Sequence, residues 1–328
     1  WKPWLPNILA TGGPLPPPLP PPLPRARAVV APPEEARPGD PTRTLPLKPA
    51  APPDLAPAPA TGASPASAAD VKVTSADVLE ALHRASGLPI VAVPTTYAGS
   101  EMTPIYGITE GGLKTTGRDP RVLPKCVIYD PELTLGLPLA FTVTSAFNAI
   151  AHAAEGLYAA DTNPVVSLMA EEGIRASAAA LFPLQHDARD LAARSDALYG
   201  AWLCGMVLGA TTMGLHHKLC HTLGGSFNLP HADVHTVVLP HALAYNAAAA
   251  PDALHRIGRA LGVGADEVPH TLQALVRRYG APVSLAAIGM PASGLDRAAD
   301  LAVQNQYANP RALDRAARNA WRISSSLP

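Results

Sequence analysis

Residues 215–246 read LHHKLCHTLGGSFNLPHADVHTVVLPHALAYN, and six of the eleven histidines of the chain lie in this stretch. His217 and His221 are four residues apart, so they share one face of a predicted helix. The glycine pair at 224–225 predicts the end of that helix, and a short loop then brings His231 in on the next segment. Three imidazoles from two helices joined by a turn are a usual way to build a metal site or a site that handles protons.

The other histidines of this stretch carry less of the prediction. His216 neighbours His217, and His241 follows Pro240, so we expect both to face away from the pocket. Any single histidine is more often a hydrogen-bonded packing residue than a ligand. The hypothesis of a site therefore depends on the spacing of several histidines together.

A second contribution comes from TSAFNAIAHAAEGLYAA, residues 144–160, which is predicted to be a helix. Asn148 and His152 lie four residues apart on one face of it. Together with His217 and His231 they would give four convergent polar side chains from three segments. Three imidazoles and an amide oxygen make a poor transition-metal site, because a carboxylate at position 148 would supply the charge that divalent ions prefer.

The region around 71–138 has the pattern of an α/β structure. A helix is predicted over 75–87, and LPIVAV (88–93) is typical of a buried parallel strand. A β-hairpin is predicted over 105–117 with Lys114 near its tip, followed by a strand over 125–130. After Leu139 the pattern is helical, with helices predicted over 144–160, 164–182, 187–214, 216–224, 232–248, 251–261, 267–279, 294–306 and 310–322.

The loop PTTYAGSEMTP (94–104) follows the first predicted strand and is rich in small and hydroxyl residues. Ligands of α/β folds bind at the carboxyl ends of parallel strands. Its candidate contacts to a phosphate or ribose are Thr95, Thr96, Gly99, Ser100 and Thr103.

Residues 1–70 hold 21 of the 38 prolines of the chain. Proline removes backbone donors and fixes φ, so polyproline II or disorder is expected there. Two further interpretations stay open: a PxxP ligand for a domain with an aromatic groove, and a GC-rich gene read out of frame. The predicted organisation is therefore a proline-rich segment 1–70, an α/β remnant 71–138 and a helical catalytic domain 139–328.

The net charge of −1 and a pI near 6.9 argue against nucleic acid or an anionic membrane surface as partner. Cys126, Cys204 and Cys220 are odd in number and far apart, which favours a reducing cytosol over a disulfide framework. Cys220 could approach the histidine site, although packing is the favoured role. The start of the chain lacks a secretory signal pattern, and no apolar stretch reaches the ~18 residues of a membrane span. A cytoplasmic protein is expected.

Three stretches together resemble the iron-containing (group III) alcohol dehydrogenase superfamily, and within it the maleylacetate reductases of bacterial aromatic degradation. They are the segment from PTTYAGSEMTP to YDPELT, NAIAHAAEGLYA, and the stretch over 215–246. The resemblance covers about residues 85–260. It implies a dehydroquinate synthase-like fold: an α/β dinucleotide-binding half, incomplete here, followed by an all-helical C-terminal domain with the active site in the cleft.

The resemblance also assigns the site residues. The positions of the family's metal ligands correspond to Asn148, His152, His217 and His231, with Asn148 where metal-dependent members carry Asp. His221 matches a further histidine near substrate and nicotinamide. The Asn at this position is shared by maleylacetate reductases, so the resemblance implies a site that needs no metal.

The implied reaction is NADH- or NADPH-dependent reduction of 2-maleylacetate to 3-oxoadipate by a homodimer. In it His217 and His221 stabilise the enolate and supply a proton, while His152 and His231 position the dicarboxylate. Lys218 and Arg118 are possible carboxylate partners or solvated surface charges. The loop 95–103 contacts cofactor phosphates and nicotinamide, and Lys114 lies near the cofactor.

One feature of the family has no counterpart in the sequence. The Gly-Gly-Gly-Ser turn that binds the pyrophosphate should precede residues 75–87, and the only glycine pair nearby is in ATGGP (10–14). Either the chain is inactive for lack of a complete cofactor domain, or residues 1–70 reflect a reading-frame error. A metal-dependent alcohol dehydrogenase and a non-catalytic chain with a proline-rich binding arm are the alternative functions. The choice between NADH and NADPH stays open.

Overall fold

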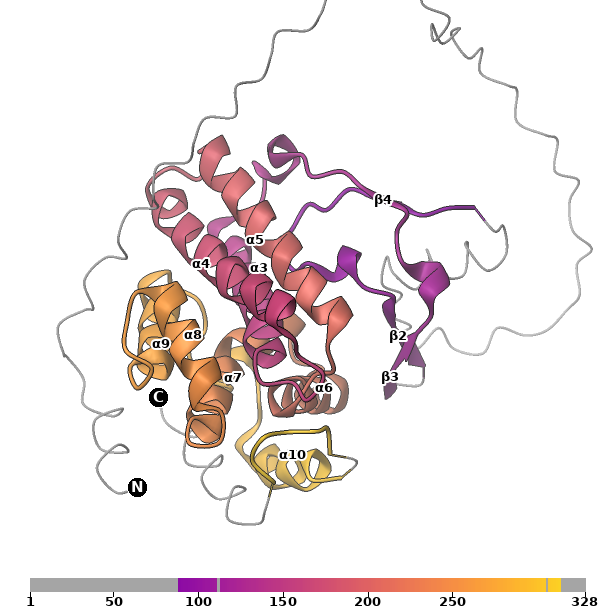
Figure 1. The fold of residues 1–328 in the computed structure, drawn as a ribbon. Coiled ribbons are helices and arrows are strands. Elements are labelled where there is room, and N and C mark those ends of the chain that lie inside the picture. Colours follow the sequence, from indigo (N-terminus) through magenta and orange to yellow (C-terminus); the bar gives the residue numbers. More distant parts are fainter. Residues whose placement is uncertain (1–87, 111–112, 305, 314–328) are drawn as a thin grey trace, which may run out of the picture. The chain divides into compact units, whose positions relative to one another are not determined.

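The computed structural model describes residues 88–110, 113–304 and 306–313. The proline-rich segment 1–70, the predicted helix over 75–87 and residues 314–322 of the helix predicted over 310–322 lie outside these residues, and the described residues 310–313 of that last helix are not helical. What is described begins with short strands and continues as a helical bundle (Figure 1). This order of an α/β part followed by helices is the one predicted.

The strands form two separate pairs. β1 (Val91–Ala92) lies parallel to β4 (Cys126–Val127), with Val91 opposite Cys126. β2 (Ile105–Glu110) and β3 (Leu113–Arg118) form the predicted antiparallel hairpin. The expectation of a buried strand over 88–93 is wrong for its side chains, because Val91 is 54% exposed and only Ile90 is buried. A parallel strand is buried when neighbours cover both faces, and β1 has a single strand partner among the described residues.

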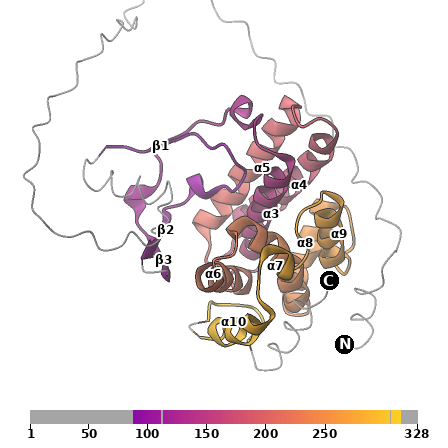
Figure 2. The ribbon, with the colours of Figure 1, turned by 180° about the vertical axis from the view of Figure 1, so that it is seen from behind.

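Helix α3 (Leu139–Gly156) lies at the centre of the bundle, and every residue from Thr142 to Gly156 is buried. It packs against α4 (Pro164–His186), α5 (Leu191–Ala210) and α7 (His231–Asn246), as both views show (Figures 1 and 2). Small and apolar residues all round α3 explain this, because a helix that is hydrophobic on every side is stable only when surrounded.

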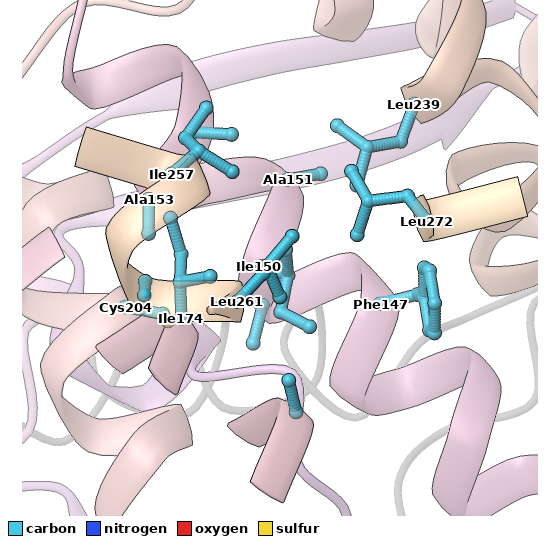
Figure 3. Close-up of a cluster of buried hydrophobic side chains, with 14 of the residues drawn as sticks. Phe147, Ile150, Ala151, Ala153, Ile174, Cys204, Leu239, Ile257, Leu261 and Leu272 are labelled. Carbon is cyan, nitrogen blue, oxygen red and sulfur yellow. The ribbon is translucent and has the colours of Figure 1, made fainter. Parts of the chain in front are cut away.

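Further helices complete the bundle. They are α6 (Leu215–Phe227), α8 (Pro251–Leu261), α9 (Val268–Arg278) and α10 (Leu295–Ala302). In Figure 3 Phe147 and Ile150 of α3 lie close to Ile174, Leu239, Leu261 and Leu272 from four other helices, in one apolar core. Among the described helices, none alone is long and apolar enough to cross a membrane.

The ends of two helices test the capping and stop signals that the sequence predicted for them. The predicted cap of α4 is confirmed, because the Asn163 side chain accepts hydrogen bonds from the N–H groups of Val165 and Val166. The predicted stop at Gly224-Gly225 is wrong, since α6 continues to Phe227 and ends at Asn228, which has φ 53°. A glycine pair permits a helix end without forcing one, and asparagine also adopts the left-handed conformation.

Candidate functional site

Glu155 of α3 connects the central helix to the histidine helix α6. Its fully buried carboxylate accepts hydrogen bonds from the backbone N–H of Gly214 and of His216, both at 2.8 Å. Gly214 caps α6 without a side chain of its own, so a carboxylate from another helix satisfies the free N–H groups there. Oε2 of Glu155 also lies 2.7 Å from Nδ1 of His217.

These contacts keep the carboxylate charged inside the protein. Burial alone raises the pKa of Glu155, but the hydrogen bond and charge of His217, the charge of His216 and the Gly214 N–H lower it to about 2. A charged Glu155 makes Nδ1 of His217 the donor of their hydrogen bond. Nε2, on the other side of the ring, is then the nitrogen of His217 that is left to bind a ligand.

His152, His217 and His235 come together from α3, α6 and α7. The rings of His152 and His217 stack with centroids 5.0 Å apart, and His235 lies 5.0 Å from His217 and 6.0 Å from His152. Each offers one ring nitrogen, and the three nitrogens lie within 4.8 Å of one another. All three side chains are at least nine-tenths buried.

This cluster contains polar atoms without partners. Among the described residues, Nδ1 of His152, Nε2 of His217, Nε2 of His235 and Oδ1 of Asn148 accept or donate no hydrogen bond. Buried polar atoms left unpaired are costly, and each one calls for a ligand, a water or an ion. Burial, together with the charges of neighbouring histidines, lowers the pKa of His152 and of His235 well below the usual value. Neutral imidazoles are the form that binds a metal ion, so the residues fit a divalent transition metal.

A second set, His216, Cys220 and His235, also brings three potential ligand atoms within 4.8 Å. Two of its nitrogens already contact each other, because Nε2 of His216 lies 2.9 Å from Nδ1 of His235. Burial raises the pKa of the Cys220 thiol well above its usual value, and a thiol binds metal only as thiolate. The first set is therefore the better candidate. The expectation that His216 faces away from the pocket is wrong, since it contacts His217 and hydrogen-bonds His235.

His221 and His231 form the outer part of the site. Their rings are parallel within 9° with centroids 6.4 Å apart, and His231 lies 4.4 Å from His235. His231 is exposed at the first residue of α7, whereas His235 is fully buried one turn later. The four predicted histidines thus gather in one place, with Asn148 one turn before His152 on α3. The structure puts His235, to which sequence reasoning gave no role, in the metal-capable set with His152 and His217.

The predicted cofactor loop has two kinds of residue. Thr95, Thr96 and Ser100 are exposed. Gly99 and Thr103 are buried and serve the fold: Gly99 has φ 80° and packs against the backbone of α5, and the Thr103 hydroxyl donates to the Ser100 carbonyl. Their role toward a cofactor stays a prediction.

The basic residues predicted near the ligands have contacts within the protein. The backbone of Lys114 pairs with Thr109 in the hairpin. Arg118 donates to the carbonyl of Gly209 in the last turn of α5, where a cation is favourable. Lys218 places its Nζ 5.7 Å from the ring centroid of Tyr307. These contacts give Arg118 a structural role.

Sequence reasoning missed three residues of the site: Glu155, His235 and Tyr307. Glu155 could have been noticed as the only charged residue of an apolar helix, three positions after His152. His235 is four residues after His231 and so shares its helix face. Tyr307 places its hydroxyl 3.0 Å from Nδ1 of His221, and no local pattern signals a contact across 86 residues.

Comparison with known proteins gives a consistent result. The C-terminal family model of Fe-containing alcohol dehydrogenases matches residues 142–318, and the model of iron-containing alcohol dehydrogenase matches residues 60–131. Maleylacetate reductase of Burkholderia cepacia is 70% identical over 230 residues, which are 70% of this chain and 65% of the relative. Maleylacetate reductase of Pseudomonas knackmussii is 62% identical over 228 residues, covering 70% of this chain and 64% of the relative. The chain thus spans less than two thirds of the length of these curated relatives.

Solved structures agree on the fold. A putative alcohol dehydrogenase from Ralstonia eutropha superposes with a TM-score of 0.74 at 61% identity, covering 77% of this chain and 72% of that one. Maleylacetate reductase from a Rhizobium strain gives a TM-score of 0.71 at 50% identity, covering 75% and 69% of the two chains.

These findings correct one expectation. The prediction of a site that needs no metal is wrong, because the matching family is the iron-containing alcohol dehydrogenases and the cluster includes buried imidazole nitrogens that can hold an ion. The prediction placed too much weight on Asn148. Three imidazoles with unpaired nitrogens already supply a ligand set, and the amide oxygen of Asn148, one turn before His152 on α3, is a further unpaired acceptor.

Proposed function

The chain belongs to the iron-containing alcohol dehydrogenase family, and on that premise we propose that it reduces the carbon–carbon double bond of 2-maleylacetate to give 3-oxoadipate. The observation that carries the proposal is the buried cluster of His152, His217 and His235, continued outward by His221 and His231. The similarity to proteins named maleylacetate reductase supports the choice of substrate.

The reaction needs a hydride at one carbon of the double bond and a proton at the other. Reduced nicotinamide, NADH or NADPH, is the hydride donor in this proposal. Negative charge then develops on the oxygen of the conjugated carbonyl, and groups placed to stabilise it lower the barrier. The role of the site is to neutralise that charge and to orient a substrate with two carboxylates.

We assign the metal-holding role to His152, His217 and His235, with Asn148 beside them. A divalent metal bound there supplies a Lewis acid toward the carbonyl oxygen on which charge develops. Glu155 fixes the ring of His217 so that Nε2 faces the cluster. This arrangement takes His217 out of proton transfer, which the sequence prediction had shared between His217 and His221.

His221 is then the histidine that handles the proton. It is half-buried, so it can donate a hydrogen bond to the enolate oxygen and exchange its proton with solvent. His231 lies stacked against it and is exposed, which suits a role in positioning a carboxylate of the substrate. Lys218, one turn away on α6, is the nearby cation for the second carboxylate.

The remaining assignments rest on the family resemblance. We propose that Thr95, Thr96, Gly99, Ser100, Thr103 and Lys114 line the cofactor side, with 71–138 as part of the dinucleotide half and 139–328 as the catalytic domain. A homodimer in the cytoplasm, where reduced nicotinamide is available for aromatic catabolism, is the expected working form. The free cysteines Cys126, Cys204 and Cys220 are compatible with a reducing compartment.

The test is NADH and NADPH oxidation by the full chain, loaded with Zn²⁺ or Fe²⁺, in the presence of 2-maleylacetate. We expect turnover that falls by roughly a hundredfold in His221→Gln, as loss of an acid–base group produces. His255→Gln is the matched control, because His255 is exposed on α8 and bonds only its own helix backbone among the contacts described. Equal rates in His221→Gln and the unmodified chain would contradict the proposal.

A second candidate is a metal-dependent alcohol dehydrogenase, which the metal-capable imidazole cluster favours. The same assay distinguishes the two by substrate. Oxidation of NADH with simple aldehydes, without oxidation in the presence of maleylacetate, would identify carbonyl reduction as the activity.

A further inference from the structure

Segment 306–313 lies across the ends of the two histidine helices. Asn309 and Asn246 exchange two amide hydrogen bonds of 2.8 and 2.9 Å, and Asn246, the last residue of α7, is fully buried. Oδ1 of Asn309 also accepts from the N–H of Leu215, the first residue of α6. One side chain of the segment therefore binds the end of α7 and the start of α6.

A second group of contacts fixes the distal part of the same segment. The Tyr245 hydroxyl donates to the carbonyl of Ala312 at 2.7 Å, and the Arg311 guanidinium stacks on the Tyr245 ring at 4.1 Å. Arg311 also donates to the Tyr245 carbonyl. With contacts at 309, 311 and 312, the backbone that carries Tyr307 is held in place against α6 and α7.

Tyr307 projects from this segment to the histidine site. Its hydroxyl lies 3.0 Å from Nδ1 of His221, and the two rings meet edge to face. Burial, followed by the charge of Glu155, raises the pKa of Tyr307, so the phenol stays protonated and able to donate. The Nζ of Lys218 faces the same ring.

We propose that Tyr307 is a positioning residue that donates a hydrogen bond to Nδ1 of His221 and so holds His221 as the Nε2–H tautomer. A neutral imidazole carries its proton on one nitrogen, and the hydrogen bond of the other nitrogen decides which. With Nδ1 as acceptor, Nε2 presents an N–H to the oxygen on which charge develops. With Nδ1 as donor, Nε2 would present a lone pair and repel that oxygen.

This inference rests on the proposed function only for the identity of the oxygen; the tautomer itself can be measured without turnover. The measurement is a long-range nitrogen–proton NMR spectrum of the full chain labelled at histidine nitrogens, with His221→Gln identifying the signal. We expect the Nε2–H pattern in the unmodified chain. Tyr307→Phe removes the hydroxyl and keeps the ring, and should give a mixture of both tautomers.

Tyr279→Phe is the matched control, because it removes a phenol hydroxyl just after α9, where the ring packs in the apolar core and faces Arg278. It should leave the tautomer of His221 unchanged. In turnover of maleylacetate, Tyr307→Phe should lower kcat about fivefold, the size expected for one lost hydrogen bond, with KM changed less than about twofold.

Two results would overturn the inference: an Nδ1–H pattern in the unmodified chain, or the same tautomer populations in Tyr307→Phe. The first does not use Tyr307→Phe, so it decides even where that variant does not fold. A tautomer shift in a chain that does not reduce maleylacetate would support the positioning role and refute the proposed function. Turnover of maleylacetate together with equal tautomer populations in Tyr307→Phe and the unmodified chain would support the proposed function and refute the positioning role.

Discussion

Glu155 is the residue on which the geometry of the histidine site depends most directly. Both of its oxygens accept hydrogen bonds: Oε1 from His216 N and the Tyr158 hydroxyl, Oε2 from Gly214 N and from His217. A buried charge is tolerated only when it is fully hydrogen-bonded, and here every partner is a donor. The same contacts begin α6 and orient His217, so folding and ligand geometry share one carboxylate.

Glu155→Gln should weaken metal binding and folding together. The amide places an N–H2 group among donors, so at least one backbone N–H of α6 loses its acceptor, at a cost of about 2–3 kcal/mol in the free energy of unfolding. Zn²⁺ affinity should fall about 10- to 100-fold, as for other partners that orient a ligand. Calorimetric titration with Zn²⁺ and urea unfolding measure the two effects.

Glu172→Gln is the control for that change, because Glu172 is a partly exposed residue of α4 paired with Arg175. It should leave Zn²⁺ affinity unchanged and alter stability by less than about 1 kcal/mol. Full Zn²⁺ affinity in Glu155→Gln would show that Glu155 has no part in orienting His217.

His235 and His231 give a second comparison at the residue scale. The structure includes His235 and not His231 in the set of nitrogens within 4.8 Å, although the family resemblance assigns a ligand to His231. His235→Ala should therefore lower Zn²⁺ affinity by at least about a hundredfold. This loss is larger than that expected on removing a residue that only orients a ligand. His231→Ala should lower it less than about tenfold. The opposite order in the titrations would return the third ligand position to His231.

At the scale of elements, the contact between the loop 94–104 and α5 depends on two glycines. A Cβ on Gly205 would lie 2.2 Å from the carbonyl oxygen of Gly99, and one on Gly99 would lie 2.5 Å from the Ala201 carbonyl. Only glycines allow the backbone of the loop to approach the helix so closely. This contact fixes where the predicted cofactor loop lies relative to the bundle.

Gly205→Ala tests that contact, because the contact decides whether the substitution raises or lowers the free energy of unfolding. In a helix interior, glycine to alanine is expected to stabilise by up to about 1 kcal/mol. The clash with Gly99 should reverse the sign and destabilise by about 1–3 kcal/mol, measured as the free energy of urea unfolding. Gly224→Ala in α6 is the matched control, since the atom nearest to the added Cβ would be the carbonyl oxygen of Leu229, at 3.9 Å. Stabilisation by both variants would contradict the close approach.

At the scale of the whole molecule, the metal cluster and the cofactor half differ in how much of each the structure describes. The cluster draws on α3, α6 and α7, all within the described helices. The described part of the cofactor half offers a two-residue parallel strand pair, the β2–β3 hairpin and a loop. Binding of a ligand to the folded chain raises its stability by RT ln(1 + [L]/Kd), so the two sites can be compared in one experiment.

We expect Zn²⁺ to raise the midpoint of thermal unfolding of the full chain by more than NADH does. At a ligand concentration 100 times Kd the gain is about 2.7 kcal/mol, which shifts the midpoint by several degrees. Ca²⁺, which prefers oxygen ligands, is the control ion and should have no effect. A shift with NADH equal to that with Zn²⁺ would show that the cofactor site is complete without the Gly-Gly-Gly-Ser turn.

By itself, the sequence determined the family, the order of an α/β part before a helical bundle, and most helices to within a few residues. It also predicted that His152, His217, His221 and His231 lie near one another, as their ring contacts show, whereas their roles and that of Asn148 stay predictions. These depend on local signals: periodicity, caps such as Asn163, and i, i+4 spacing. Tertiary structure decided the rest. Glu155, whose carboxylate orients His217, lies 62 positions before it, and Tyr307 lies 86 positions after His221. The third imidazole of the metal set is His235, one turn further along α7 than His231. Such contacts depend on how the helices pack against one another, and a short window of sequence carries no information about that packing.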